Sequence, residues 1–399
     1  MTQTHIVRKP GLDIDLLDVG LFAGRREHEA FRRLRAEAPV HFNPEPDGPG
    51  FYALTRYDHI ARIAQDHQRF ISGQGTQIRD KRAEGSGHPS VHNADPPVHG
   101  RLRSVGMPAL RRSVLNARAD AFRRCIVDLI EQTPSGAPFD FVDQIAVRIP
   151  MIIFAETLGV PEAMQPVLVD WANTMSDIFA TEEAQSKARA DLFAYFRTLA
   201  EEKRAQPGDD MATALVHGTI DEAPLSQEQL DAYFMVLTVA GNETTRNLLS
   251  GGLEQLALQP EDFQRLRDEP GLVPVAVEEM VRWVSPIIQM RRTATEDTDL
   301  FGTPVQAGDK VVLYFASANR DERMFERPDL FQVDRKANPH MGFGFGPHFC
   351  LGVHLARIEA QIFFEEIARR LTRIEIDGLG ERLPSNWFAG TTRLMVRWS

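Results

Sequence analysis

Cysteine is scarce in this chain, and the scarcity excludes several kinds of structure. Only Cys125 and Cys350 occur among 399 residues. Two cysteines are too few for a disulfide framework, and they suit a reducing compartment better than an oxidising one. We therefore expect a cytoplasmic protein.

Positive charge and long apolar runs are also lacking. The chain carries 45 basic and 56 acidic residues, a formal net charge of −11, so no nucleic-acid partner is expected. No run of eighteen or more apolar residues occurs, and residues 1–10 lack the apolar core of a secretion signal. We therefore expect a soluble protein without a membrane span.

Helical spacing of apolar residues dominates the chain, and no repeat, low-complexity tract or long linker divides it. We expect one mainly α-helical domain over residues 1–399 with a small β subdomain. The β portion is predicted at about residues 35–75 and 287–315 together with C-terminal strands. The predicted strands are 40–42, 51–55, 289–294, 310–315, 371–376 and 391–398.

The most distinctive stretch is Phe343–Gly352, which gathers glycine, aromatic and basic residues around Cys350. A helical pattern follows it directly, so Cys350 is predicted at a helix N-terminus, where the helix dipole favours a thiolate. Taken alone, this stretch is compatible with a reactive thiol, half of a zinc site or an axial ligand of haem iron. A zinc site lacks a second Cys or His pair nearby, and Cys125 is expected to be a buried core thiol.

A long helix is predicted to begin after Ser226, which forms a capping-box pattern with Gln229, and to run to about Leu258. Its middle holds the sequence Ala240-Gly241-Asn242-Glu243-Thr244-Thr245. Glycine costs about 1 kcal/mol relative to alanine there, and such rule-breaking is expected at functional sites. Thr244 can bond back to the carbonyl of Ala240, and Glu243 with Thr244 could pass protons into a buried site. A kinked core helix is an equally good interpretation of this stretch alone.

Two further groups of charged residues stand out. Glu279 and Arg282 share a helix face among strongly apolar neighbours, which favours a buried pair that Arg335 could join. His99 and Arg103 are four residues apart and share one face of another predicted helix, and Arg292 lies on a predicted strand after a turn. Each of these residues, taken alone, would be interpreted as a charge on the surface. Together with His348 they form a set of cations suited to the two propionates of a haem.

These motifs, in this order, resemble those of the cytochrome P-450 superfamily of haem-thiolate monooxygenases. Phe343-Gly-x-Gly-x-His-x-Cys-x-Gly352 matches the family's cysteine-ligand motif, and Ala240–Thr245 matches its oxygen-activation motif. Glu279-x-x-Arg282 with Arg335 matches its Glu–Arg triad. The segment Asp95–Arg103 is similar to its propionate-binding helix.

The resemblance implies a helical fold with haem b between the long helix and the helix after Cys350. It implies that Cys350 is the iron ligand, that Glu243 and Thr244 deliver protons during oxygen activation, and that Glu279, Arg282 and Arg335 are structural. The residues implied to contact the haem are His99, Arg103, Gly241, Arg292, Phe343, His348, Cys350 and Gly352.

The resemblance also indicates substrate and partners. A hydrophobic small molecule of terpenoid, hydrocarbon, aromatic or steroid type is expected, with electrons from a separate ferredoxin and reductase, and the protein is expected to be a monomer. The loop Ser72–His92 is predicted to border the distal pocket, and the side chains expected to line it are Phe179, Val236, Ala240, Ile287, Ile288 and Phe388. The alternative is a non-catalytic haem-binding sensor or carrier on the same fold.

Overall fold

The structure, a computed structural model, describes residues 12–79, 90–176 and 180–399. Helices make up most of it and the sheets are small, which confirms the predicted fold class. The α-helices are α1 Val19–Ala23, α2 Glu27–Glu37, α3 Tyr57–Gln65, α4 Val98–Gly106, α5 Arg112–Ala117, α6 Ala119–Glu131, α7 Arg148–Leu158, α8 Gln165–Ser176, α9 Glu182–Ala205, α10 Met211–Val216, α11 Gln227–Leu258, α12 Pro260–Asp268, α13 Val273–Val284, α14 Phe315–Ala318 and α15 Val353–Arg370.

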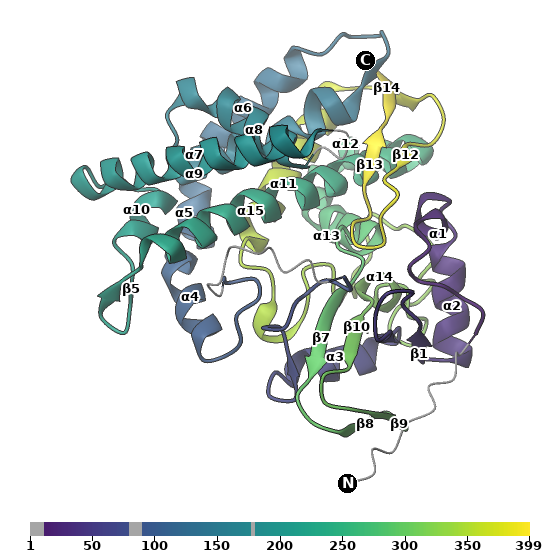
Figure 1. The fold of residues 1–399 in the computed structure, drawn as a ribbon. Helices are drawn as coiled ribbons and strands as arrows, with labels where there is room; N and C mark the ends of the chain where they lie inside the picture. Colours follow the sequence, from purple (N-terminus) through teal and green to yellow (C-terminus); the bar gives the residue numbers. More distant parts are fainter. Residues whose placement is uncertain (1–11, 80–89, 177–179) are drawn as a thin grey trace.

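Helix α11 is the longest element and lies near the middle of the helical part (Figure 1). The predicted capping box starts it, because the backbone N–H of Gln229 donates to Ser226 Oγ at 3.3 Å and the backbone N–H of Ser226 donates to Gln229 Oε1 at 2.8 Å. Helices α7, α9, α13 and α15 pack against it. The largest apolar core therefore surrounds α11.

The strands form one main sheet and several small ones. The main sheet has the order β1-β2-β10-β7-β3, in which β10 runs parallel to β2 with Lys310 opposite Phe51, and all other neighbours are antiparallel. A second sheet has the order β11-β14-β4. The strands are β1 Val40–Asn43, β2 Phe51–Leu54, β3 Phe70–Ile71, β4 Phe139–Asp140, β5 Thr219–Ile220, β6 Ala223–Pro224, β7 Met290–Ala294, β8 Thr298–Leu300, β9 Thr303–Val305, β10 Lys310–Leu313, β11 Ile374–Ile376, β12 Glu381–Arg382, β13 Thr391–Arg393 and β14 Met395–Trp398.

The main sheet separates two smaller cores, and its central strand β2 is apolar on both faces. In β2, Tyr52 and Leu54 join one cluster, whereas Phe51 and Ala53 join the other. Because successive side chains of a strand point to opposite faces, a strand covered on both sides must be a continuous apolar run. The same sheet holds β7, which carries Arg292 to the functional cavity described below.

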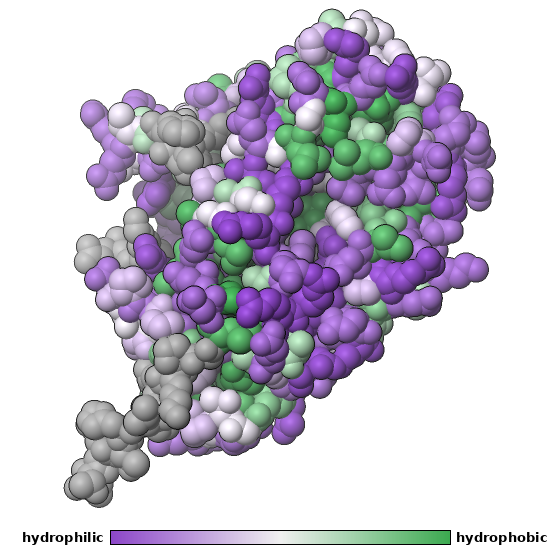
Figure 2. Space-filling view, turned by 90° about the vertical axis from the view of Figure 1, so that its right-hand side faces the viewer, coloured by the Kyte–Doolittle hydropathy of each residue, from purple (hydrophilic) through white to green (hydrophobic). Residues whose placement is uncertain are grey.

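No helix in residues 12–79, 90–176 and 180–399 is long and apolar enough to cross a membrane. The face drawn in Figure 2 is largely hydrophilic, with hydrophobic residues in a patch near the top of the view and in a band left of its centre.

Candidate functional site

A cavity of about 250 Å³ lies between α11 and the Phe343–Gly352 loop, which we call the cysteine loop. Helices α4, α7 and α15 and strand β7 also contribute to its wall. The expected haem contacts His99, Arg103, Gly241, Arg292, Phe343, His348, Cys350 and Gly352 all line it, and so does Thr244. Residues spread over most of the chain therefore meet at one site.

Three backbone hydrogen bonds shape the cysteine loop. The N–H of Cys350 donates to the Phe343 carbonyl at 2.9 Å, that of Phe349 donates to Gly346 at 3.0 Å, and that of Gly344 donates to Met341 at 2.9 Å. Gly346 has φ +75°, and a Cβ there would lie 2.4 Å from the carbonyl oxygen of Ala64 in α3. This glycine is therefore required for packing of the loop against α3.

Cys350 was predicted at the N-terminus of a helix, and the structure differs from this prediction. Helix α15 begins only at Val353, so Cys350 lies in the loop before it. Burial raises the pKa of the Cys350 thiol, and a backbone hydrogen bond at Gly352 opposes that rise only in part. The buried surroundings of the sulfur therefore favour the thiol form, and a metal ion bound at the sulfur would favour the thiolate.

A chain of contacts supports the cysteine loop from outside the cavity. The guanidinium of Arg357 lies over the Phe343 ring, 4.8 Å from its centroid. Its Nε and one terminal nitrogen each donate at 2.7 Å to the Glu278 carboxylate, which also lies 3.1 Å from Nε2 of His340. These contacts lower the pKa of Glu278 to about 2, against the opposing effect of burial. Glu278 therefore anchors the loop through Arg357.

The opposite wall of the cavity comes from α11. As expected, the Thr244 hydroxyl donates to the Ala240 carbonyl, at 2.8 Å. A Cβ added to Gly241 would meet nothing within 4 Å, so the backbone there borders open space. A flat or small ligand can approach α11 closely at this point.

Glu243 does not line the cavity, although Thr244 does. Its carboxylate is ion-paired with Arg246 one turn further along α11. Burial raises the pKa of Glu243, and Arg246 opposes this rise. Residues adjacent in a helix do not share a face, so the expected acid–hydroxyl pair is not in direct contact in this conformation.

Cationic side chains gather at one edge of the cavity. The rings of His99 and His348 lie 4.1 Å apart, centroid to centroid, and Nε2 of His348 is 3.2 Å from the Ser72 hydroxyl. Nε2 of His99 is buried and has no hydrogen-bond partner within the described ranges. Arg292 is buried beside them.

The cationic edge has too little negative charge of its own. Burial, with Arg292 and His99 nearby, lowers the pKa of His348 to about 2, and burial lowers the pKa of Arg292 to about 10. Asp95 acts on Arg292, but its carboxylate already accepts the N–H groups of Ser72 and Gly73 at 2.7 and 2.9 Å. An anion bound at this edge would offset the buried charge of Arg292, and it would favour protonation of His348, whose ring is neutral without it.

The residues present fit a haem. A thiol on one wall, a bare helix backbone on the other and unneutralised cations at the edge suit a flat, metal-bearing group with two carboxylates. The orphaned Nε2 of His99 gives that group a hydrogen-bonding partner as well.

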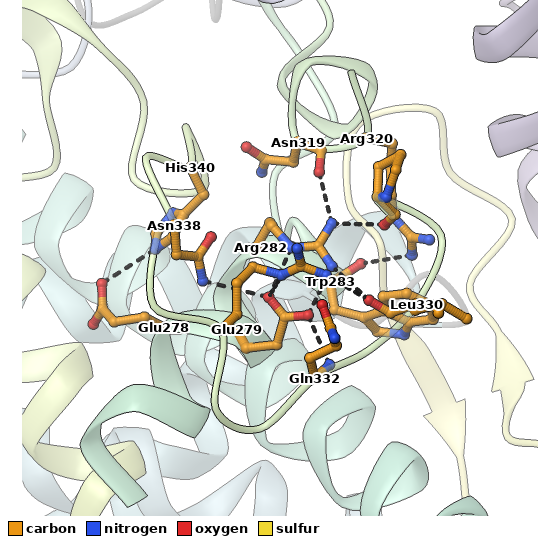
Figure 3. Close-up of polar contacts among 12 residues, drawn as sticks. Glu278, Glu279, Arg282, Trp283, Asn319, Arg320, Leu330, Gln332, Asn338 and His340 are labelled. Atoms are coloured by element: carbon orange, nitrogen blue, oxygen red, sulfur yellow. Dashed lines mark hydrogen bonds and ion pairs between the residues drawn. The ribbon is translucent and has the colours of Figure 1, made fainter. Parts of the chain in front are cut away.

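The predicted Glu279 triad is present and buried, and Figure 3 shows its Glu279 and Arg282 side chains in contact. Arg282 donates to both carboxylate oxygens of Glu279 at 2.7 Å, and Nε of Arg335 donates to Oε2 at 2.9 Å. Arg282 also donates to the carbonyls of Asn319 and Pro328, both at 2.8 Å. The triad therefore joins α13 to the segment that precedes the cysteine loop.

The expected substrate-pocket residues are only partly brought together. Val236, Ala240 and Ile287 line the cavity. Ile288 does not, because it points to the opposite side and packs in a core with residues such as Leu16, as successive residues of an extended segment must. Phe388 forms a β-bridge with Ile287 but is absent from the cavity wall. Phe179 lies outside the described residues.

Several residues at the site were missed by the sequence analysis. His92 and Thr76 belong to the predicted loop Ser72–His92, line the cavity, and are hydrogen-bonded at 2.7 Å. Burial and Arg292 lower the pKa of His92 to about 4. Glu278 and Glu359 were also missed, because acidic residues in helices are usually solvent-exposed.

Comparison with known proteins gives a consistent result. The family profile "Cytochrome P450" matches residues 187–386. Linalool 8-monooxygenase of Pseudomonas putida is 35% identical, over 96% of this chain and 98% of its own. Methyl-branched lipid omega-hydroxylase of Mycobacterium tuberculosis is 37% identical, over 93% of this chain and 90% of its own.

A solved structure agrees with these relatives. The Mycobacterium marinum cytochrome P450 CYP268A2 in complex with pseudoionone superimposes with a TM-score of 0.90 and 31% identity. The match covers 98% of this chain and 100% of that one. The protein therefore belongs to the cytochrome P450 family, and it is a monooxygenase with haem b as its cofactor.

Proposed function

We propose that the protein hydroxylates a hydrophobic small molecule with a branched aliphatic chain, of terpenoid or lipid type. The observation that carries this proposal is the apolar part of the cavity wall above the cysteine loop, where Val236, Ala240 and Ile287 gather. Apolar walls with few polar groups select hydrophobic ligands. Two relatives are named for action on linalool and on methyl-branched lipids, which supports the same class.

The roles of the chain's own residues follow from their places. Cys350 would hold the haem iron as a thiolate, and His99, Arg103, Arg292 and His348 would bind the propionates through charge-assisted hydrogen bonds. Thr244 would hold a proton at the cavity wall, supplied from the direction of Glu243. When bound, the haem supplies the oxygen-activating chemistry, which its thiolate ligand promotes.

Electrons must reach the haem from a redox partner. Two cysteines cannot hold an iron–sulfur cluster with four thiolate ligands, so we propose a separate ferredoxin and reductase. We also propose a cytoplasmic monomer, which the scarcity of cysteine and the net charge of −11 support. Light scattering of the purified protein measures its oligomeric state directly.

The ligand assignment is tested with Cys350→Ser. The carbon monoxide adduct of the reduced wild type is expected to show the long-wavelength Soret band of a thiolate ligand, and the variant is expected to lose it. Survival of this band in the variant would overturn the assignment. Cys125→Ser is the matched control, because this thiol lies on α6 away from the cavity, and its spectrum is expected to match that of the wild type.

The substrate class is tested by titration of the haem-loaded protein with linalool, a methyl-branched fatty acid and benzoate. Binding near the iron displaces water and shifts the spin state, so we expect saturable spectral shifts with the first two compounds and none with benzoate. Product analysis after incubation with NADH and a surrogate ferredoxin system then identifies the hydroxylated carbon. A shift with benzoate alone would refute the proposed class.

A further inference from the structure

Arg357 of α15 is a cation near Cys350 that the proposed function leaves unused. Burial raises the pKa of the Cys350 thiol, and Arg103 and Arg357 are the two charged side chains that oppose this rise. Arg103 already has a proposed role at the haem propionates. Arg357 does not line the cavity, so its charge acts on the sulfur from outside the cavity.

Direct contacts join Arg357 to the backbone of Cys350. The guanidinium lies over the Phe343 ring, 4.8 Å from its centroid, where the electron-rich face of the ring attracts a cation. The Phe343 carbonyl in turn accepts the N–H of Cys350 at 2.9 Å. Arg357 is therefore packed on the residue whose carbonyl positions the sulfur-bearing residue.

Glu278 of α13 holds this guanidinium in place. Its carboxylate accepts two hydrogen bonds of 2.7 Å from Arg357, the forked geometry that fixes the orientation of a guanidinium. It also lies 3.1 Å from Nε2 of His340 (Figure 3). Because Nδ1 of His340 accepts the N–H of Gly342 at 3.2 Å, Nε2 carries the proton of the neutral ring and donates it to Glu278.

The charges of this group are balanced only as a pair. His340 can donate its hydrogen bond as a neutral ring, and Glu278 is the one acidic partner of Arg357 within the described ranges. Of the two charged residues, only Arg357 acts on the Cys350 thiol. A mechanical anchor for the loop could be apolar, whereas a charged pair at this place also sets the electric field at the sulfur.

We propose that Arg357 and Glu278 set the reduction potential of the bound haem through Cys350, a role that rests on the proposed ligation of the iron by this residue. Reduction adds one electron, which the redox partner supplies, and part of the added negative charge spreads onto the sulfur ligand. The Arg357 cation favours this reduced state and so raises the potential, whereas Glu278 moderates the field and fixes the guanidinium. Neither residue lines the cavity, so both are positioning residues.

The test measures the midpoint potential of the haem-loaded protein by spectroelectrochemical titration without substrate. Arg357→Gln removes the cation, so we expect the ratio of reduced to oxidised haem at a fixed potential to fall about three- to tenfold, where tenfold corresponds to about 59 mV for one electron. Glu278→Gln removes the opposing carboxylate, and we expect this ratio to rise, by a smaller factor. The double variant Glu278→Gln/Arg357→Gln should lie between the two single variants, because their charge changes are opposite in sign.

A merely structural anchor predicts a different pattern. Loss of either partner would then loosen the cysteine loop in the same way, so both single variants would shift the potential in one direction and the double variant would match them. That pattern would overturn the proposal, and so would unchanged potentials. Arg357→Lys keeps the charge without the forked hydrogen bonds, so its potential should lie closer to that of the wild type than the potential of Arg357→Gln does.

Arg369→Gln is the matched control. It removes an exposed arginine of the same helix that is ion-paired with Glu366, and its potential is expected to equal that of the wild type. An equal shift in this control would assign the effect to the net charge of the protein and overturn the proposal.

The carbon monoxide adduct of each reduced protein shows whether Cys350 still binds the iron. A wild type without the thiolate band would refute the proposed ligation itself, whereas an intact band with both single variants shifted in one direction would overturn only the role of the pair. If Arg357→Gln loses the band, Glu278→Gln and Arg357→Lys decide, because both keep the cation. A lowered potential in Glu278→Gln would then overturn the proposal.

Discussion

Glu243 and Thr244 are consecutive on α11, yet only Thr244 faces the cavity, because the carboxylate of Glu243 is held by Arg246. Under the proposed function, the acid would have to leave this ion pair before it could supply a proton towards the cavity.

The first prediction concerns Arg246→Gln. Arg246 opposes the burial that raises the pKa of Glu243 above 4.5, so its removal raises this pKa further. A carboxyl with a raised folded-state pKa contributes most to stability at low pH, and the contribution is lost as pH rises through that pKa. We expect the variant to lose about 1–3 kcal/mol at pH 7 and much less near pH 4. Thermal unfolding across this pH range measures the effect.

The control for this prediction is the double variant Glu243→Gln/Arg246→Gln. This variant has no carboxyl group at position 243, so its free energy of unfolding relative to wild type should not fall as pH rises beyond pH 5. A steep fall in the double variant would assign the effect to another group.

The second prediction concerns Thr244. Its hydroxyl is at the cavity wall and bonds to the Ala240 carbonyl, a contact that contributes little to helix stability. We expect Thr244→Ala to fold normally but to release most reducing equivalents as hydrogen peroxide, whereas Thr244→Ser should remain coupled. Peroxide and product per NADH oxidised are the measurements. Full coupling in Thr244→Ala would remove this hydroxyl from proton delivery.

The third prediction concerns the anchor of the cysteine loop. The pKa of Glu278 is lowered from 4.5 to about 2, so its stabilising contribution is present above pH 4.5 and is lost as pH falls towards 2. We expect Glu278→Gln to cost about 1–2 kcal/mol at pH 7, a figure reduced for solvent screening. Acid unfolding curves should converge with those of the wild type near pH 2–3. A constant difference at every pH would contradict the ionic origin.

The fourth prediction concerns the cationic edge. Arg292 is buried where a haem propionate would offset its charge, so we expect Arg292→Gln to lose haem about 10- to 100-fold faster, equivalent to about 1.4–2.8 kcal/mol. Transfer of haem to an excess of an apo-globin measures this rate. Arg292→Lys keeps a positive charge, so its rate of haem loss should lie between those of the wild type and Arg292→Gln. Equal rates in all three proteins would exclude the propionate contact.

The fifth prediction compares two glycines. Alanine at Gly346 would be strained by the φ of +75° and by the Ala64 carbonyl 2.4 Å away, so Gly346→Ala should cost about 2–4 kcal/mol. Gly100 on α4 meets nothing within 4 Å, and Gly100→Ala should be neutral or stabilising by up to about 1 kcal/mol. Denaturant unfolding compares both with wild type.

Sequence reasoning predicted the fold class, the long helix and the Glu279 triad because each depends on a local pattern with a physical cause. The capping box at Ser226 and the apolar neighbours of Glu279 are visible within a few residues of each site. Cys350 stood out because glycine, aromatic and basic residues surround it, although its assignment as the iron ligand came from the family resemblance.

The residues that were missed depend on packing between distant segments. Glu278 and Glu279 are neighbours of the same residue type, and the sequence does not distinguish their roles. In the structure Glu278 binds Arg357 on α15, whereas Glu279 binds Arg335. Glu359 is buried beside Thr245 of α11, and this contact between two helices leaves no signal in the sequence. The exclusion of Ile288 depends on which side of an extended segment faces the cavity.

The parallel pairing of β2 with β10 has a consequence for the order of assembly. It joins residues near position 51 to residues near position 310, so the main sheet closes only after most of the chain has been made and brought together. Strand β7, which presents Arg292, pairs with β10 in the same sheet. The cationic edge of the cavity is therefore completed only once β10 is in place, and a nascent chain that ends before β10 would lack the strand against which β7 pairs.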